Sequence, residues 1–176
     1  MTLDTLKDPI EAPMTSFALK YGLITAMVGI AISLVIYLTG NIAQAWAGWV
    51  GLPVIIYLYY FFQKKFRDEY QEGYVSFGKA FKLGALMVVI GSVVNGIFTY
   101  FIFSDSEVMD QIMEKSYNNM VEKGMSSAQI DQAMEMSASF MTPTAMMAFA
   151  ALGGIFFGLI LVLITSAIVK KDHAFN

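Results

Sequence analysis

The chain has 176 residues, of which 57% are hydrophobic and 14% charged, and its formal net charge is −3. Soluble domains average about 45–50% apolar and about 25% charged residues, so this composition is shifted toward membrane proteins. The lack of cysteine excludes disulfides, thiolate metal sites and cysteine nucleophiles. With His173 as its single histidine, the chain also lacks the ligands for a haem, zinc or copper centre, and we expect no cofactor.

Four stretches of 19 to 25 residues contain no Asp, Glu, Lys or Arg. A helix rises about 1.5 Å per residue and the hydrocarbon core is about 30 Å thick, so each stretch can cross a bilayer. Soluble helices are rarely apolar on every face over such lengths. The sequence therefore predicts an all-α fold, a four-transmembrane-helix bundle forming one domain over residues 1–176. The predicted spans are 21–39, 42–62, 83–103 and 145–169.

Gly40 and Asn41 alone separate the first two spans, so we expect these spans to form an antiparallel hairpin. We expect the first span to be retained rather than cleaved as a signal peptide, because its apolar run exceeds the usual length of about 7–15 residues. Pro53 stands in the middle of the second span and removes one backbone hydrogen bond, which predicts a kink.

Small residues recur along one face of each span. Lipid tails are as apolar as leucine, so helices in a bilayer associate through close backbone contact at such residues, and the pattern predicts a tight bundle. Asn95 is the deepest amide, and as the intramembrane polar candidate it either bridges helices or contacts a ligand. The small-residue series are Thr25, Gly29 and Ser33; Ala43, Ala47 and Gly51; Gly84, Gly91 and Gly96; and Ala150, Gly154 and Gly158.

The segment after the second span combines basic and aromatic residues. Lys64, Lys65 and Arg67 are candidates for contact with lipid headgroups, although retention of positive charge in the cytoplasm explains them equally well. We expect Gly73 to end one helix and Ser76 to cap the next. An aromatic stripe in this segment suits a helix end in the headgroup region, and it consists of Phe66, Tyr70, Tyr74, Phe77 and Phe81.

Residues 104–144 are predicted to form a helical hairpin insert between the third and fourth spans. An apolar stripe runs along residues 107–123, and Gly124 is placed to end that helix. Ser126 and Gln129 have the pattern of a capping box for the second helix. Thr142 and Pro143 are placed to begin the fourth span. The candidates for contact with a partner are apolar side chains of both helices: Ile112, Met113, Tyr117, Met120, Ile130, Met134 and Phe140.

Nine of the 13 methionines lie between Met109 and Met147. One interpretation is packing within the hairpin, and another is an adaptable groove for a partner or the membrane surface. Thioethers also bind Cu(I), but no second histidine and no cysteine is present to support such a site.

The distribution of Lys and Arg predicts the orientation, because positively charged loops stay in the cytoplasm. Nine basic residues fall in the N-terminal segment, the second loop and the tail, against two in the alternate segments. The segment 104–144 carries seven acidic residues and two lysines. We therefore expect a multi-pass protein of the cell inner membrane with both termini cytoplasmic and this insert on the opposite side.

The block Gly73-Tyr74-Val75-Ser76-Phe77-Gly78-Lys79-Ala80 resembles an uncharacterised bacterial family of four-helix membrane proteins, a domain of unknown function. Lys20-Tyr21-Gly22 at the first span, Arg67-Asp68 and Pro143 are similar to it as well, and the resemblance extends over nearly the whole chain. It implies an inner-membrane location in Gram-negative bacteria and brings no activity or catalytic residues. The methionine content of the insert is the point of departure.

No charged residue lies deep in a span, and no nucleotide-binding, hydrolase or zinc-protease motif is present, so an enzyme is not expected. The sequence favours a non-catalytic accessory or scaffold protein that binds a partner through the hairpin or the bundle faces. The alternative is a small-solute transporter or channel with a site near Asn95 and Pro53. Expected partners are membrane lipids and another membrane or periplasmic protein, with a homo-oligomer possible and no nucleic acid.

Overall fold

The structure of the protein is a computed structural model whose described residues are 11–41, 44 and 46–172. These residues form helices, and an isolated antiparallel β-bridge joins Val75 to Lys171. The prediction of an all-α fold is confirmed. The helices are α1 (Glu11–Leu38), α2 (Ala47–Val50), α3 (Leu52–Tyr70), α4 (Phe77–Phe103), α5 (Ser106–Glu122), α6 (Ser127–Phe140) and α7 (Pro143–Val169).

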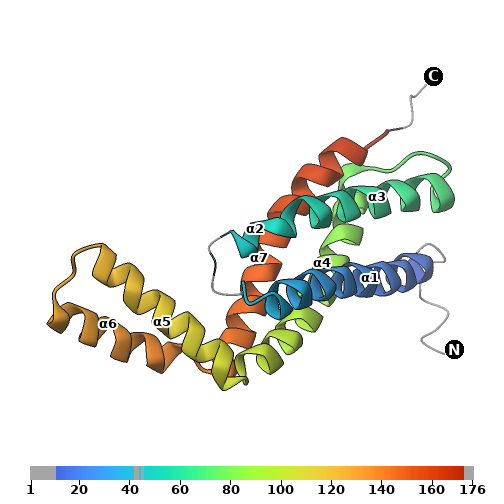
Figure 1. Ribbon diagram of the computed structural model, residues 1–176. Coiled ribbons are helices and arrows are strands. Elements are labelled where there is room, and N and C mark those ends of the chain that lie inside the picture. Colours follow the sequence, from blue (N-terminus) through green and yellow to red (C-terminus); the bar gives the residue numbers. More distant parts are fainter. Residues whose placement is uncertain (1–10, 42–43, 45, 173–176) are drawn as a thin grey trace, which may run out of the picture.

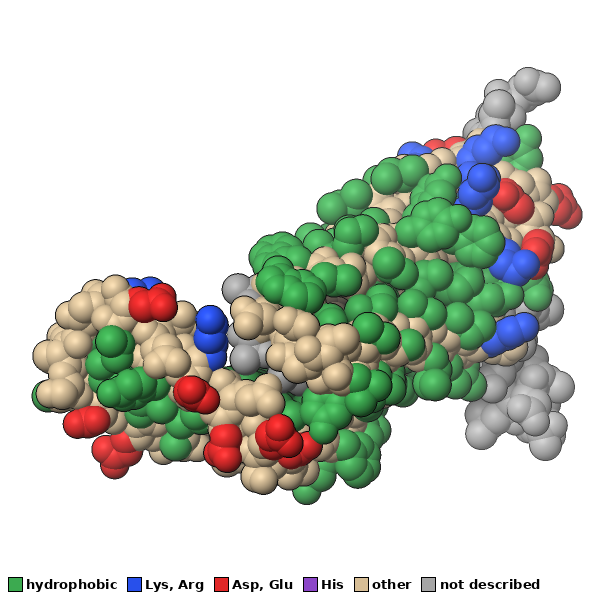
Figure 2. All heavy atoms as spheres, viewed as in Figure 1, with side chains coloured by type: hydrophobic (Ala, Val, Ile, Leu, Met, Phe, Trp, Pro, Cys, Tyr) green, Lys and Arg blue, Asp and Glu red, His purple; other side chains and the backbone are tan. Residues whose placement is uncertain are grey.

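Three helices of the described chain are long and apolar enough to cross a membrane, namely Met14–Leu38 within α1, α4 and α7. Helix α4 packs against both α1 and α7, and α3 completes the bundle by packing mainly on α7 (Figure 1). The sides of this bundle are covered with exposed apolar side chains (Figure 2). Such a surface suits contact with lipid, and it indicates a membrane protein.

The second predicted span is not one continuous helix in the described residues. Helix α1 ends at Leu38 and the next helix begins at Ala47, so the predicted two-residue loop is wrong. A stretch without charges reports compatibility with lipid and does not specify backbone conformation. The predicted start of this span, at residues 42, 43 and 45, lies outside the described residues.

Pro53 lies in the first turn of α3 rather than inside a helix. The helical run is interrupted at Gly51, which ends α2 and precedes α3. Proline fits the first turn because the N–H that it lacks has no partner within the helix there. We expected a kink at Pro53; the structure places a junction of two helices two residues earlier, at Gly51, whose backbone angles remain helical (φ −75°, ψ −21°).

The core at one end of the bundle is aromatic. The ring of Phe17 lies 5.2 Å from that of Phe66 and 4.2 Å from that of Tyr21, which in turn lies 4.5 Å from Phe62. Phe66 is fully buried, so the interpretation of the stripe from Phe66 to Phe81 as a headgroup-facing surface is wrong for this residue. The aromatic rings of α3 instead join α3 to α1.

Glycines allow α4 and α7 to approach closely. A methyl group added at Gly158 would stand 2.6 Å from the side chain of Val88, and one added at Gly96 would stand 3.0 Å from Ala151. A contact as short as that at Gly158 is essentially never observed, and one of 3.0 Å is tighter than nearly all real contacts, so a side chain at either position requires its neighbours to move. The small residues were predicted to allow tight packing of helices, and between α4 and α7 they do.

Residues 73–84 lie at the same end of the bundle, where α3, α4 and α7 meet. Gly73 adopts a left-handed conformation with φ +82° after α3, and the side chain of Ser76 accepts the backbone N–H of Lys79 to cap α4. Both helix-end predictions are confirmed. Val75 and Lys171 exchange two backbone hydrogen bonds of 3.0 Å, which fix the chain after α7 beside this loop.

A buried amide lies behind that block. Gln63 of α3 is 1% exposed, and its Nε2 donates to the carbonyl of Ala80 at 3.1 Å and to Ser166 Oγ at 2.8 Å. Gln63 thus joins α3 to α4 and α7. Its Oε1 has no partner within the described part of the chain.

Helices α5 and α6 contact each other and extend away from the bundle between α4 and α7 (Figure 1). Gly124, with φ +71°, follows α5, and the Ser126 N–H donates to Gln129 Oε1 at 3.0 Å at the start of α6. Thr142 Oγ1 accepts the N–H of Ala145 and caps α7. The predicted end of α5, capping box and start of α7 are confirmed.

Basic residues are unevenly distributed along the molecule (Figure 2). Most Lys and Arg side chains lie at the end of the bundle formed by the 71–76 loop and the end of α7, with some Asp and Glu side chains among them, and we call this the basic end. Asp and Glu side chains are spread over α5 and α6, which we call the acidic end.

Candidate functional site

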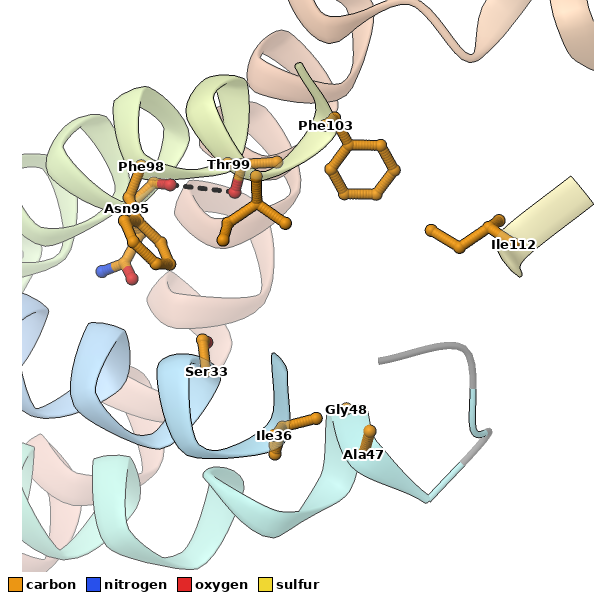
Figure 3. A pocket seen from close by; sticks show the side chains of 10 residues that line it. Ser33, Ile36, Ala47, Gly48, Asn95, Phe98, Thr99, Phe103 and Ile112 are labelled. Atoms are coloured by element: carbon orange, nitrogen blue, oxygen red, sulfur yellow. Dashed lines mark hydrogen bonds between the residues drawn. The ribbon is translucent and has the colours of Figure 1, made fainter. Parts of the chain in front are cut away.

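A crevice lies between α1, the α2–α3 junction, α4 and α7. It consists of two adjoining cavities of about 280 and 330 Å³. Both cavities are lined by Ser33, Ile36, Ala47, Gly48 and Asn95, so they form one hollow. Figure 3 shows the smaller cavity, which reaches Phe103 and Ile112 at the acidic end.

The crevice exists because small residues of three elements face one another. The larger cavity is lined by the series Thr25, Gly29 and Ser33 of α1, together with Ala150, Gly154 and Gly158 of α7. Small side chains were predicted to bring helices together, and between α4 and α7 they do. Before the α2–α3 junction they leave open space instead: a methyl group added at Gly48 would have no neighbour within 4 Å.

The hydroxyl groups of two buried residues line the larger cavity. Tyr59 of α3 is 5% exposed, and its hydroxyl stands 3.9 Å from the position of a methyl group added at Gly91 of α4. Ser92 of α4 is 8% exposed and faces Gly154 of α7. Neither hydroxyl forms a hydrogen bond with the described part of the chain, and neither is sealed from the cavity.

Asn95 stands at the centre of the crevice and lines both cavities. Its Nδ2 donates to the carbonyl of Gly91 at 2.9 Å, and its Oδ1 lies over Gly29 of α1, 3.3 Å from the position of an added methyl group. No hydrogen bond from the described residues reaches Oδ1. Asn95 was predicted either to bridge helices or to contact a ligand. Its Nδ2 is held by its own helix, and its Oδ1 is the atom left for a ligand.

The crevice is electrically neutral. No charged side chain is among the described residues that line the two cavities. The hydroxyl of Thr99 is also occupied, since it donates to the carbonyl of Asn95 at 2.9 Å. The groups available to a ligand are therefore uncharged hydrogen-bonding groups set in an apolar wall.

The predicted partner-contact residues divide into three groups. Ile112 lines the smaller cavity at the base of α5. Ile130 is 4% exposed and belongs to the contact between α5 and α6, with Met113, Met120 and Met134 half-buried. Tyr117 and Phe140 are 47% and 58% exposed. Of the predicted set, these last two are presented to the surroundings.

The candidate lipid-facing residues lie at the basic end. Lys64 is exposed, and Lys65 pairs with Glu69, which raises the pKa of Lys65. Arg67 Nη1 donates to the carbonyl of Val169 at 3.1 Å, at the C-terminus of α7. Its Nε bonds Asp68 at 2.7 Å, and this bond holds the pKa of Asp68 below its ordinary value. The guanidinium of Arg67 therefore joins α3 to α7.

Sequence reasoning singled out Asn95 and missed Tyr59 and Ser92. The sequence does not show which of the tyrosines at positions 57, 59 and 60 turns inward. The signal that could have found the crevice was the coincidence of small-residue series on several spans.

The fold and the crevice define a helical membrane protein with a neutral cavity inside its bundle. The chain belongs to the DUF4199 family of proteins of unknown function, whose model matches residues 20–171. No curated protein and no solved structure matches the chain.

Proposed function

We propose that this protein is a non-catalytic accessory or scaffold protein of the cell inner membrane that binds a protein partner through α5 and α6. The observation that carries the proposal is a set of exposed apolar side chains on two helices that extend beyond the bundle. These side chains are Tyr117, Val121, Met136 and Phe140, between 47% and 59% exposed. Exposed aromatic and methionine side chains are typical of contact surfaces between proteins.

The proposed arrangement has four spans, with α2 and α3 together forming the second. Helix α3 runs beside α7 between the ends of the bundle, and the connection after α1 lies near α5, where Val108 is buried and lines a hollow with Tyr37. The uneven distribution of basic residues supports a cytoplasmic basic end and an extracytoplasmic acidic end. The termini at 1–10 and 173–176, also proposed to be cytoplasmic, lie outside the described residues.

The surface on α5 and α6 has an apolar strip with an acidic border (Figure 2). Asp110, Glu114 and Glu135 are exposed on the same helices. A border in which carboxylates outnumber lysines favours a partner with a basic rim and disfavours association with acidic proteins. The proposed partner is another membrane or periplasmic protein, and a second copy of this acidic chain fits less well.

The test is photo-crosslinking in living cells with a photoreactive phenylalanine analogue at Tyr117 or, as a matched control, at Asn118. Both positions are exposed on α5 and adjacent in sequence, so they face different directions. We expect a discrete protein adduct from position 117 and none from position 118.

A second crosslinking experiment uses substituted proteins. Tyr117→Glu should abolish the adduct formed by an analogue at Phe140, whereas Asn118→Glu adds the same charge beside it and should leave the adduct intact. Adducts with lipid alone at position 117, or equal adducts from both positions, would show that α5 binds no protein partner.

A further inference from the structure

We infer that the crevice binds an uncharged lipid from the bilayer whose polar end carries hydroxyl and carbonyl groups. The inference does not depend on the partner surface of α5 and α6. The hydroxyls of Tyr59 and Ser92 and the amide oxygen of Asn95 belong to residues that line a single hollow, and none of the three forms a hydrogen bond with another described residue.

Unpaired polar groups are costly in this setting. A hydroxyl or amide placed in an apolar environment without a hydrogen bond is unfavourable, and the bilayer core supplies no water to compensate. Phenylalanine would fill the same volume as Tyr59 without an unpaired oxygen. The hydroxyl of Tyr59 is therefore explained if it forms a hydrogen bond with a ligand. The same holds for Ser92, which alanine would replace.

The chemistry of the walls restricts the ligand. The hydroxyls of Tyr59 and Ser92 can donate to a carbonyl, and Asn95 Oδ1 can accept from a hydroxyl. Because none of the described residues that line the hollow is cationic, a phosphate group would be buried there without a counter-charge from them, which is strongly unfavourable. The ligand is therefore neutral and carries both a donor and an acceptor.

The shape indicates the route of entry. Leu52 and Phe157 line the larger cavity and are 39% and 65% exposed, so the hollow opens on the lipid-facing side of the bundle. Its volume of about 330 Å³ is at the lower end of ligand pockets, which range over roughly 300–1,000 Å³. It accommodates the polar end and the first part of a chain, with the remainder of the lipid outside.

The test is photolabelling with a diacylglycerol that carries a diazirine near its polar end, in phosphatidylcholine vesicles containing the full chain. Diacylglycerol has the required hydroxyl and ester carbonyl groups and no charge. We expect label on peptides from α1 and α4 around Gly29 and Asn95. Unlabelled diacylglycerol should compete, and phosphatidylglycerol should not.

Two variants locate the site. Gly48→Leu fills a position with no neighbour within 4 Å on the wall of both cavities, so it should reduce labelling roughly fivefold or more by occupying the hollow. Gly153→Leu is the matched control, since Gly153 also has no neighbour within 4 Å and lines neither cavity. Labelling of the control should equal that of the parent protein.

A third variant tests the hydrogen bonds without changing the volume. Tyr59→Phe should weaken diacylglycerol competition roughly 3- to 10-fold, the loss expected for one hydrogen bond, with no loss of thermal stability. Equal labelling of Gly48→Leu and the parent protein, or equal competition by phosphatidylglycerol and diacylglycerol, would overturn the inference. So would unchanged competition in Tyr59→Phe, which would leave a hollow that holds only water.

Discussion

The hydroxyl of Tyr37, near the end of α1, donates a 2.7 Å hydrogen bond to Oδ2 of Asp105, whose Oδ1 accepts the Glu107 N–H and begins α5. One carboxylate thus caps a helix and holds the end of another. The hydrogen bond from Tyr37, followed by that from the Glu107 backbone, holds the pKa of Asp105 below its ordinary value of 3.8. These two hydrogen bonds favour the ionised form of the carboxylate that joins the end of α1 to the start of α5.

This relationship predicts a pH dependence. Because the folded-state pKa of Asp105 is lowered, its contribution to stability is complete above pH 3.8 and is lost as the pH falls through the lower folded value. We expect the decrease in unfolding temperature between about pH 6 and pH 3, followed by circular dichroism in detergent, to be smaller in Tyr37→Phe than in the parent protein. Asp110→Asn, at an exposed carboxylate of the same helix, should retain the parent decrease. A Tyr37→Phe profile identical to the parent profile would contradict the coupling.

Substitution of glycine by alanine should have opposite effects on the free energy of unfolding at two positions of α4, Gly84 and Gly78. A methyl group added at Gly84 would stand 2.5 Å from Gln63 Nε2 and would also collide with Val162, and both side chains are fully buried. We expect Gly84→Ala to lower the free energy of unfolding by about 1–3 kcal/mol, the usual cost of overpacking. Gly78→Ala, in the exposed first turn of the same helix with no neighbour within 4 Å, should raise it by roughly 0.5–1 kcal/mol through helix propensity. Unfolding measurements in detergent check both, and a stable Gly84→Ala protein would mean that α4 and α7 are less closely packed here.

The bond between Gln63 and Ser166 predicts a measurable coupling between α3 and α7. In a double-mutant cycle with Gln63→Leu and Ser166→Ala, we expect a coupling energy of about 0.5–1.5 kcal/mol, the net value of one hydrogen bond. Thr165→Val supplies the control, because the buried hydroxyl of Thr165 donates to Val162 of its own helix and not to Gln63. Equal coupling in the two cycles would indicate a general packing effect instead of this hydrogen bond.

The number of spans can be measured directly, because the chain has no cysteine and single cysteines can be introduced without background. Thr39→Cys, Glu72→Cys and Asn118→Cys are placed at exposed positions after α1, after α3 and on α5. With four spans, a membrane-impermeant maleimide added to spheroplasts should label positions 39 and 118, and position 72 only after the membrane is opened. If α2 and α3 do not cross the membrane, positions 39 and 72 should respond alike.

The sequence by itself determined the helical class, three long apolar helices and several helix ends. Local chemistry is sufficient for these features: an apolar run of bilayer length is helical because only helices satisfy its backbone, and Ser76, Gly124 and Thr142 act on backbone groups within a few residues. The same reasoning gave the wrong loop before α2, because lack of charge does not specify backbone conformation.

Only the tertiary structure decided where the small residues bring two helices into close contact and where they leave space between helices. Gly158 packs against Val88 and Gly29 against Asn95, whereas Gly48 has no neighbour within 4 Å and borders a hollow. Packing distance depends on what the facing helix presents and on where α2 and α3 are interrupted, and neither is encoded in the spacing of one helix. For the same reason, the inward turn of Tyr59 and the bond between Tyr37 and Asp105, 68 residues apart, could be found only once the helices were placed.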